Sequence, residues 1–468
     1  MKILAVIANY GTKNERYLLQ LLEAYRSMKH RVDIAVLSNI SKDFGPDVEV
    51  IVGLPDPDPW SLPFGYKTVM NARRNDYDLF IYTEDDTLIT EDNISAFLDL
   101  TKFLNDDEIA GFMRYEIGPD NQKYYSTIHG SYFWDPRSIR RRGHYTLAHY
   151  TNDHSGGFIL TAPQLKKCLD SGGFMQGVRK GRYDMLCTAA TDPYTQCGMQ
   201  KLVPVSHLER FLLAHLPNVY LGRIGIRAEE LAPQLNKMAE MAGSGRTSEP
   251  LFETRAGLDT TEFDKQYYEP CRTDLIELTA PHAQTFLSIG CGWGKTEAGL
   301  LGEGKRVTAI PLDEVIGASA AARGIETIES DFEAAFGKLD DRRFDCIIIH
   351  EILEHLSDPQ TLLNRLASFL AKNGQLIVSL HHIGPIRGWW RRLREDPIMK
   401  QLNEISNFSQ FRFQILSPEI VCHWMKRCGL KNINSKLLHP DSKMRYTSLK
   451  RQLLNRLWAQ NIIILAEK

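Results

Sequence analysis

Three consecutive carboxylates, Glu84, Asp85 and Asp86, directly follow the apolar run Leu79–Thr83. Such a run is typical of a buried β-strand, so the three acids are expected at the C-terminal end of that strand. Adjacent like charges repel one another and are costly without a counter-ion. Hard cations such as Mg²⁺ and Mn²⁺ take carboxylate oxygens and bridge substrate phosphates. The pattern therefore predicts a metal site, with an acidic loop before the next helix as the alternative.

The second chemical pattern is rich in glycine and spans Phe286–Gly299 (FLSIGCGWGKTEAG). An apolar strand runs into Gly290–Gly294, and a helix is expected to follow. Glycines allow a tight turn and a close approach of a ligand, and a helix N-terminus favours carboxylates and phosphates. Lys295 and Thr296 follow Gly294, so the longer dinucleotide fingerprint is absent. The pattern predicts a cofactor site, with a tight turn that holds no ligand as the alternative.

Histidines in the second half offer acid–base chemistry. His350 and His355 come after the predicted strand Phe344–Ile349, and His381 comes after Gly374–Leu380. The C-terminal ends of strands in open α/β sheets carry the binding sites. These histidines favour a hydroxyl group as the substrate and a general base beside it. The alternative for each is an ordinary hydrogen-bonded histidine of the surface or core.

Strands and helices alternate in both halves, which predicts mainly parallel sheets covered by helices. In the first half we expect strands Ile3–Ala8, Val32–Leu37, Val48–Val52 and Leu79–Thr83, with helices near Glu15–Met28 and Gly65–Asn75. In the second half we expect strands Thr285–Ile289, Arg306–Ile310, Phe344–Ile349, Gly374–Leu380, Asn432–Leu438 and Asn461–Ala466. The helices expected there are Lys265–Leu278, one from about Lys295, Ser319–Arg323 and Pro359–Leu370. The stretch 239–262 is rich in Gly, Ser, Thr and charge, and it predicts a linker between domains 1–238 and 263–468.

The composition sets limits on the function. The chain has 468 residues, 43% of them hydrophobic and 24% charged, and a net charge of −2. These values favour two or three folded domains and exclude a disordered chain or a uniformly basic nucleic-acid-binding surface. No apolar run is long enough for a membrane span, and the first residues predict a strand rather than a signal peptide. The eight cysteines have no metal spacing, so we expect reduced thiols in a cytoplasmic protein.

The second half, over residues 263–468, resembles class I S-adenosylmethionine-dependent methyltransferases in the order and spacing of its segments. The resemblance implies a Rossmann-like domain and S-adenosylmethionine as cofactor. It implies cofactor contacts from Gly290, Cys291, Gly292, Gly294, Asp331 near the adenine, and His350. Catalytic roles in methyl transfer would fall to His381 and His355. The family usually ends its second strand with a ribose-binding acid, but Pro311 stands there, so Asp313 either reaches the ribose or caps a helix.

The first half resembles GT-A glycosyltransferases of the family-two type over about 220 residues. Glu84-Asp85-Asp86 matches the strand-terminal motif that holds a metal and a nucleotide sugar in that family. The resemblance places Asp184 at the position of the catalytic base, with Asp153 as the second candidate. His207 is a candidate further metal or diphosphate ligand. The family's base-reading Asp is absent, and Asn9 and Tyr10 are candidate nucleotide contacts instead.

Together these features predict an α/β protein of two domains, a GT-A nucleotide-sugar-binding domain and a Rossmann-like methyltransferase domain. We expect a bifunctional enzyme that uses Mn²⁺ or Mg²⁺, transfers a sugar from a nucleotide-sugar donor to a saccharide or lipid-linked acceptor, and methylates the glycan. Nucleic acid is not an expected partner. The Arg- and Trp-rich stretch 384–396 predicts a lid, or a patch that holds an acidic glycan or makes a peripheral contact with the inner face of the membrane. The rival hypotheses are a methyltransferase whose first domain only binds glycan, and a scaffold without activity.

Overall fold

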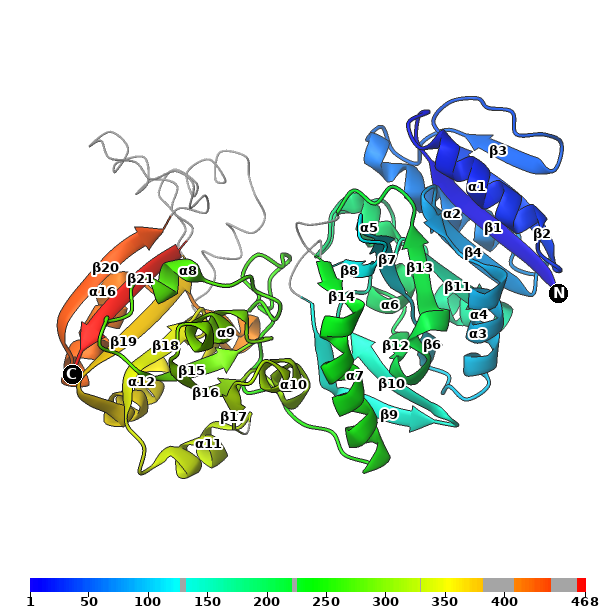
Figure 1. Ribbon diagram of the computed structural model, residues 1–468. Helices are drawn as coiled ribbons and strands as arrows, with labels where there is room; N and C mark the ends of the chain where they lie inside the picture. Colours follow the sequence, from blue (N-terminus) through cyan, green and yellow to red (C-terminus); the bar gives the residue numbers. More distant parts are fainter. Residues whose placement is uncertain (127–131, 221–224, 329, 382–407, 439–460) are drawn as a thin grey trace. The chain divides into compact units, whose positions relative to one another are not determined.

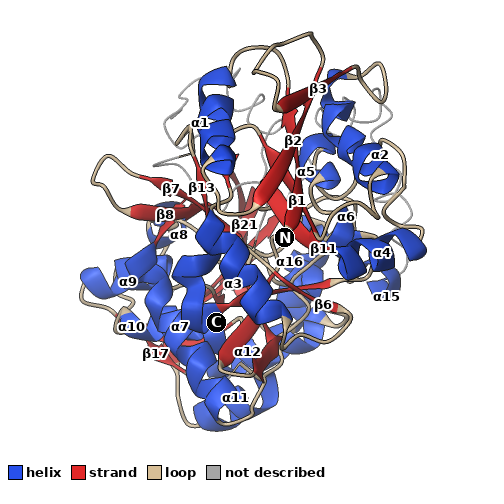
Figure 2. Cartoon of the chain, turned by 90° about the vertical axis from the view of Figure 1, so that its right-hand side faces the viewer, coloured by secondary structure: helices blue, strands red, loops and turns tan. Residues whose placement is uncertain are grey.

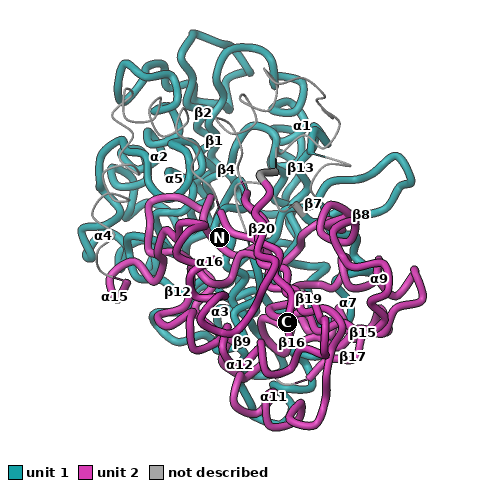
Figure 3. Tube along the Cα trace, turned by 90° about the vertical axis from the view of Figure 1, so that its left-hand side faces the viewer, with its two compact units in different colours: residues 1–247 teal, residues 248–468 magenta. Residues whose placement is uncertain are grey.

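The computed structural model describes residues 1–126, 132–220, 225–328, 330–381, 408–438 and 461–468. They form two compact units, Met1–Thr247 and Ser248–Lys468 (Figures 1 and 3). Each unit is α/β, as the alternation of strands and helices predicts. No helix of the described segments is long and apolar enough to cross a membrane. The stretch 384–396 lies outside the described residues.

The first unit is built on a five-stranded sheet. Its order is β11 (Gly157–Thr161), β4 (Leu79–Glu84), β1 (Lys2–Asn9), β2 (Arg31–Ser38), β3 (Val48–Val52). The last four strands are mutually parallel, whereas β11 pairs with β4 in the antiparallel direction. Ala8 of β1 pairs with Glu84 of β4, so the C-terminal ends of these central strands lie side by side.

Helices cover both faces of this sheet, with α1 (Glu15–Arg26) on one side and α2 (Gly65–Ala72) on the other (Figure 2). Helix α1 buries Leu18, Leu21, Leu22 and Tyr25, which recur at helical spacing along one face. The unit also contains α3 (Glu91–Thr101), α4 (Ala162–Asp170), α5 (Met185–Ala189), α6 (Asp192–Thr195) and α7 (Ala228–Gly243), and the 3₁₀ helices η1 (Pro59–Phe64) and η2 (Val205–Phe211). Thr90 starts α3 with a capping box, which leaves the three acids before it available for other contacts.

Two smaller sheets complete the first unit. One has the order β6 (Glu108–Ala110), β12 (Gln200–Pro204), β10 (Tyr145–Tyr150), β9 (Trp134–Arg142). The other has the order β14 (Gly225–Arg227), β8 (Lys123–Ser126), β7 (Met113–Ile117), β13 (Leu212–His215), β5 (Thr87–Leu88). His215 of β13 pairs with Thr87 of β5, which brings β13 and its neighbour β7 to the acidic turn after β4.

The second unit is built on one seven-stranded sheet. Its order is β17 (Glu326–Thr327), β16 (Arg306–Pro311), β15 (Thr285–Cys291), β18 (Phe344–His350), β19 (Leu370–His381), β21 (Asn461–Glu467), β20 (Lys431–Leu438). Strand β21 is antiparallel to both of its neighbours, and the five strands before it are parallel. The helices are α8 (Thr273–Ile276), α9 (Lys295–Gly302), α10 (Glu314–Ala322), α11 (Phe332–Leu339), α12 (Pro359–Phe369), α15 (Phe408–Phe411) and α16 (Pro418–Arg427), with the 3₁₀ helix η3 (Leu353–His355).

The structure differs from the sequence-based expectation at the junction of the two halves. Helix α7 continues to Gly243, and the division between the units falls after Thr247 instead of at a linker 239–262. Leu251, Phe252 and Leu258 are buried within the second unit. The composition of this stretch is typical of a linker, but its apolar side chains are buried in the second unit. We call residues 248–264 the cover segment.

The expected helix Lys265–Leu278 is a second difference, because only α8 (Thr273–Ile276) is helical there. The backbone N–H of Lys265 donates to the carbonyl of Thr254 in the cover segment, and the Tyr267 carbonyl accepts from Trp293 N–H. These contacts tie residues 265–267 to the cover segment and to the glycine turn. Tertiary hydrogen bonds have therefore replaced those of a helix.

Candidate functional site

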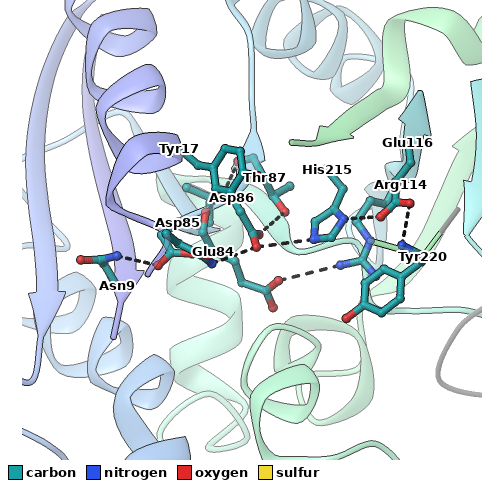
Figure 4. A network of polar contacts seen from close by, with 12 residues as sticks. Asn9, Tyr17, Glu84, Asp85, Asp86, Thr87, Arg114, Glu116, His215 and Tyr220 are labelled. Atoms are coloured by element: carbon teal, nitrogen blue, oxygen red, sulfur yellow. Dashed lines mark hydrogen bonds and ion pairs between the residues drawn. The ribbon is translucent and has the colours of Figure 1, made fainter. Parts of the chain in front are cut away.

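The acidic turn after β4 is the centre of the candidate site in the first unit (Figure 4). Glu84 ends the strand, and Asp85 and Asp86 form the turn into β5. Asp85 and Asp86 share one partner, because Asn14 Nδ2 donates to Asp85 Oδ1 at 2.8 Å and to Asp86 Oδ2 at 3.2 Å. Glu84 turns instead to His154 and Arg114.

Asp85 is held by two asparagines from the N-terminal segment. Asn9 Nδ2 donates to Asp85 Oδ2 at 2.6 Å, and Asn14 Nδ2 donates to Asp85 Oδ1 at 2.8 Å. Burial and the neighbouring charge of Asp86 raise the pKa of Asp85 to about 6, although both amide hydrogen bonds oppose the shift. Asn9 is itself fixed because its Oδ1 accepts from Lys42.

Glu84 is directed to the opposite side, towards His154 and Arg114. His154 Nε2 lies 2.9 Å from Glu84 Oε1, and Arg114 Nη1 lies 3.9 Å from Glu84 Oε2. Burial alone would raise the pKa of Glu84. The charge and hydrogen bond of His154, with the Arg114 charge, outweigh burial and lower this pKa. Glu84 is thus a firmly ionised carboxylate.

Asp86 faces a histidine from β13 that the sequence analysis did not identify. His215 Nε2 lies 3.5 Å from Asp86 Oδ2, and His215 Nδ1 lies 2.5 Å from Glu116 Oε1. Burial lowers the pKa of His215, but its contacts with the two carboxylates outweigh burial and raise the pKa above its ordinary value. The Tyr220 ring stacks on the His215 imidazole with centroids 5.4 Å apart. No local pattern in the sequence marks His215, because only the pairing of β13 with β5 brings it to Asp86.

A cleft of about 250 Å³ opens beside the acidic turn. Its lining consists of Ala8, Tyr10, Lys13, Asn14, Pro59, Leu62, Pro63, Leu186 and the three acids. The Tyr10 side chain is half exposed at this cleft, and Pro59, Leu62 and Pro63 come from η1. The cleft combines a cation, an aromatic ring, an apolar wall and carboxylates. These are the groups that a phosphorylated, ring-containing ligand would need.

The described residues contain no group of three or more His, Cys, Asp or Glu side chains arranged to hold a metal ion. Glu84 turns away from Asp85 and Asp86, which share Asn14. His207 is a poor candidate, because it packs against Tyr145 and His144 and hydrogen-bonds Ser206. A role of His207 as a further metal or diphosphate ligand stays a prediction, and His215 is the histidine that lies beside Asp86. His207 lies on η2, and its ring packs against β10.

The two candidate bases of the first unit lie on different segments. Asp184 is the N-cap of α5, where its Oδ1 accepts from Cys187 N–H at 2.8 Å, and Leu186 of the same helix lines the cleft. Asp153 precedes His154, and its carbonyl accepts from the buried Lys201 ammonium at 3.0 Å. Both residues are thus near the acidic turn, and Asp184 is the one on the helix that borders the cleft.

The glycine turn of the second unit has the expected strand–turn–helix setting, with β15 before it and α9 after it. Gly290 and Gly294 have φ of 68° and 84°, which side chains rarely adopt. At Gly292 a Cβ atom would lie 2.2 Å from the Tyr267 carbonyl oxygen. Cys291 is buried in the core, and burial raises the pKa of its thiol. Much of the glycine requirement therefore comes from the chain's own packing.

Charged side chains line the small cavity of about 30 Å³ at this turn. His350 Nε2 lies 2.8 Å from Glu269 Oε2 and 2.7 Å from Arg272 Nη1. An amino-acid ligand presents one carboxylate and one ammonium, which match the lining residues Lys265 and Glu269 in charge. The lining therefore fits the methionine end of S-adenosylmethionine in its chemistry.

The two acids expected to contact the rest of the cofactor are both helix N-caps. Asp313 is buried and its Oδ1 accepts from Ile316 N–H at 2.8 Å at the start of α10. Asp331 is exposed and its Oδ1 accepts from Ala334 N–H at 2.8 Å at the start of α11. Capping accounts for one oxygen of each side chain.

Acids and histidines meet at the ends of β18 and β19. His381 lies between Glu351, at 3.6 Å, and Glu354, at 3.4 Å, and these carboxylates raise the pKa of His381 to about 9 against the effect of burial. His355 is instead buried between the rings of Phe252 and Phe413, and burial lowers its pKa to about 3. His381 is therefore cationic and His355 neutral at pH 7. Glu351 has φ of 52°, a strained conformation for a residue with a side chain.

Comparisons with known proteins concern the second unit. Residues 263–435 match a family model described as a methyltransferase domain. The ubiquinone biosynthesis O-methyltransferase of Alkalilimnicola ehrlichii is 26% identical over 171 residues, which cover 34% of this chain and 67% of that protein. That of Xylella fastidiosa is 34% identical over 116 residues, covering 24% and 47% respectively. The chain thus spans about half to two thirds of the length of these relatives.

Solved structures of low sequence identity also align with the chain. An S-adenosylmethionine-dependent methyltransferase from Archaeoglobus fulgidus is 16% identical with a TM-score of 0.32, covering 42% of this chain and 91% of that one. The N-methyltransferase NodS from Bradyrhizobium japonicum, in complex with S-adenosyl-L-homocysteine, is 15% identical with a TM-score of 0.29, covering 42% and 84%.

Proposed function

Since the second unit contains a class I S-adenosylmethionine-dependent methyltransferase domain, we propose that the chain methylates a hydroxyl group of a glycan that its first unit has extended. The similarity to O-methyltransferases supports oxygen as the methylated atom. S-adenosylmethionine, when bound, supplies an activated methyl group on sulfonium. The chain's own residues must bind the acceptor and orient its hydroxyl.

The acids and histidines at the ends of β18 and β19 supply this orientation. His381, cationic between Glu351 and Glu354, is a hydrogen-bond donor rather than a ready base. Glu351 also lies 3.7 Å from His350 and 3.9 Å from Arg272, so it links the acceptor side to the cavity at the glycine turn. We assign His381 the role of orienting the acceptor oxygen. His355 is a core histidine in this arrangement.

The first unit is proposed to be a GT-A glycosyltransferase, and one observation carries this proposal. Three carboxylates at the C-terminal end of a central parallel strand border a cleft that also offers Tyr10, Lys13 and Asn14. Open α/β sheets bind their ligands at this edge. A nucleotide sugar has a ring to stack, a diphosphate and a sugar, which match these groups.

A divalent cation, Mn²⁺ or Mg²⁺, is part of this proposal. Mg²⁺ is often bound by only one or two carboxylates together with substrate phosphates. Asp86 and Asp85 could supply such carboxylates once a diphosphate enters the cleft. The proton of the acceptor hydroxyl would pass to a carboxylate, for which Asp184 is our first candidate and Asp153 the second.

The pairing of the two units supports a common substrate, a saccharide or a lipid-linked saccharide in the cytoplasm or at the inner membrane face. The principal rival is a methyltransferase whose first unit binds glycan without transferring sugar. A screen of nucleotide sugars with Mn²⁺, and of S-adenosylmethionine, by thermal unfolding would separate the two, because a ligand of the native state raises the melting temperature. Stabilisation by one nucleotide sugar, with release of its nucleotide when an acceptor is added, is expected. Stabilisation by glycan and S-adenosylmethionine alone would favour the rival.

A further inference from the structure

Arg114 on β7 is a buried guanidinium whose hydrogen-bond donors find no acceptor among the described residues. Its side chain lies on the far side of Glu84 from Asn9 (Figure 4) and the residue is 7% exposed. Its contacts within the described segments are the 3.9 Å approach to Glu84 and the Tyr220 ring, 5.7 Å from the guanidinium carbon. Neither contact is a hydrogen bond by distance or geometry. Arg114 lines a narrow cavity, so its donors are available to a ligand that carries acceptors.

A second polar side chain with unused donors lines the same narrow cavity. Asn152 is 7% exposed, and its Oδ1 accepts from His154 N–H at 3.0 Å. Its side-chain amide N–H₂ has no acceptor in the part of the chain that the structure describes. The cavity is lined by Phe112, Met113, Arg114, Tyr150, Asn152 and His154. Donors from β7 and from the loop after β10 therefore converge on one space.

The position of this cavity relative to the cleft assigns it to the sugar side of the site. Glu84 lines the cleft that also contains Tyr10 and Lys13. The same Glu84 carboxylate contacts Arg114 and His154 of the narrow cavity. If a nucleotide sugar binds in the cleft, its sugar, rather than its base or diphosphate, would thus lie towards the Arg114 cavity.

We propose that Arg114 and Asn152 form a subsite for the carboxylate of an acidic sugar, a uronic acid. A planar guanidinium matches a carboxylate with two parallel hydrogen bonds, and the Asn152 amide adds a third donor. The proposal rests on the proposed function of the first unit, since it names the class of sugar that the unit handles. The carboxylate belongs either to the donor sugar or to the acceptor sugar.

Two alternative roles for Arg114 fit less well. The Arg114 charge helps to lower the pKa of Glu84, but His154 is the residue that contacts this carboxylate at 2.9 Å, and the 3.9 Å approach leaves the hydrogen-bond donors of Arg114 unused. A phosphate ligand is tetrahedral and bulkier, whereas the cavity of about 10 Å³ admits little more than the edge of a small planar group. The negative charge of Glu84 would repel any bound anion, and the contact of Glu84 with His154 reduces this repulsion.

Isothermal titration of the full chain with Mn²⁺ tests the subsite with two matched pairs of probes. The donor pair is UDP-glucuronate and UDP-glucose, and the acceptor pair is methyl glucuronide and methyl glucoside. We expect the glucuronyl member of one pair to bind at least tenfold more tightly, and the pair concerned identifies the source of the carboxylate. Arg114→Gln should remove this preference.

Asn152→Asp serves as a second variant, because it should also remove the preference by charge repulsion while it retains the size of the side chain. Arg210→Gln, at an exposed ion pair with Asp92, is the matched control and should bind as the parent does. No preference in either pair, or a preference that survives in Arg114→Gln, would overturn the subsite. Binding of UDP-glucose that depends on Asp86 would then still support the glycosyltransferase. A methyl glucuronide preference without binding of either UDP-sugar would support the subsite and contradict the glycosyltransferase.

Discussion

Asp184 has an observed role as a helix cap and a proposed role as a base, and one substitution can separate them. Its Oδ1 caps α5 through the N–H of Cys187, and the proposed function makes it the base for sugar transfer. Asn caps a helix as well as Asp does but cannot accept the proton. We expect Asp184→Asn to remain folded, to bind donor normally and to transfer sugar at least about a hundredfold more slowly, as steady-state kinetics would show.

The matched control is Asp358→Asn, which makes the same change at the N-cap of α12 in the second unit. This variant should transfer sugar at the parent rate. Near-normal transfer by Asp184→Asn would move the role to Asp153 or to another carboxylate.

Substitution of Asp86 tests whether binding of the nucleotide sugar depends on a metal ion. Asp86→Ala removes one carboxylate and the contact with His215, so Mn²⁺-dependent binding of a nucleotide sugar should be lost in a titration. Glu84→Ala should be milder in this assay, because Glu84 turns towards His154. Equal metal-dependent affinity in Asp86→Ala and the parent would mean that the turn is only an acidic loop.

His381 gives the second unit a pH dependence with a definite sign. Its pKa is about 9 in the folded state, above the ordinary value of about 6.5 in the unfolded chain. Protonated His381 therefore adds to the free energy of unfolding of the second unit. This contribution is complete below pH 6.5, is lost as the pH rises through 9, and amounts to about 3 kcal/mol in total. Thermal unfolding of the second unit should therefore show a lower melting temperature at pH 9.5 than at pH 7. His381→Gln should lose most of this difference, and an unchanged difference would exclude His381 as its source.

At the scale of elements, the turn after β15 shows how far sequence reasoning could go. The run of apolar residues before Gly290 and the helix after Gly294 predict the strand, the turn and the helix, and the structure confirms them. The sequence does not reveal that the Tyr267 carbonyl occupies the space beside Gly292, because residues 267 and 292 meet only through the tertiary fold.

This contact changes the interpretation of substitutions in the turn. In Gly292→Ala the new Cβ would lie 2.2 Å from the Tyr267 carbonyl oxygen, so the backbone must shift. We expect the second unit to lose about 1–3 kcal/mol of stability even without cofactor, measured by denaturant unfolding. Gly302→Ala, where nothing lies within 4 Å of the new Cβ, is the control. Full stability of Gly292→Ala would imply that the segment around Tyr267 moves aside easily.

At the acidic site, too, the sequence predicts the strands but not the contacts that only the tertiary fold makes. Hydrophobic runs predict β1, β2, β3 and β4 nearly to their ends, and the position of Glu84, Asp85 and Asp86 at a strand end is confirmed. The partners of the acids could not be predicted. His215, Glu116 and Arg114 belong to short strands of another sheet, and strand pairing over long separations leaves no local pattern.

At the scale of the whole molecule, the junction between the units predicts where the chain can be divided. The Leu251 N–H donates to the Leu312 carbonyl, and Gly257 N–H donates to the Phe411 carbonyl. Leu251 and Phe252 are buried, and each large apolar side chain contributes roughly 1.5–3 kcal/mol. A fragment 248–468 should therefore fold and bind S-adenosylmethionine, whereas a fragment 263–468 should be several kcal/mol less stable in urea unfolding. Equal stability of the two fragments would show that the cover segment is dispensable.

The pairing of distant segments around the acidic turn also has a consequence for how the first unit folds. Asn9 meets Asp85 across 76 positions of sequence, and Glu116 meets His215 across 99. Contacts of such high separation form slowly, because a long loop must close before any of them is gained. The acidic turn is thus completed only when both ends of the unit have been brought together. After dilution from denaturant, recovery of ligand binding should lag behind recovery of helical signal, since α1 and α3 need only local contacts to begin.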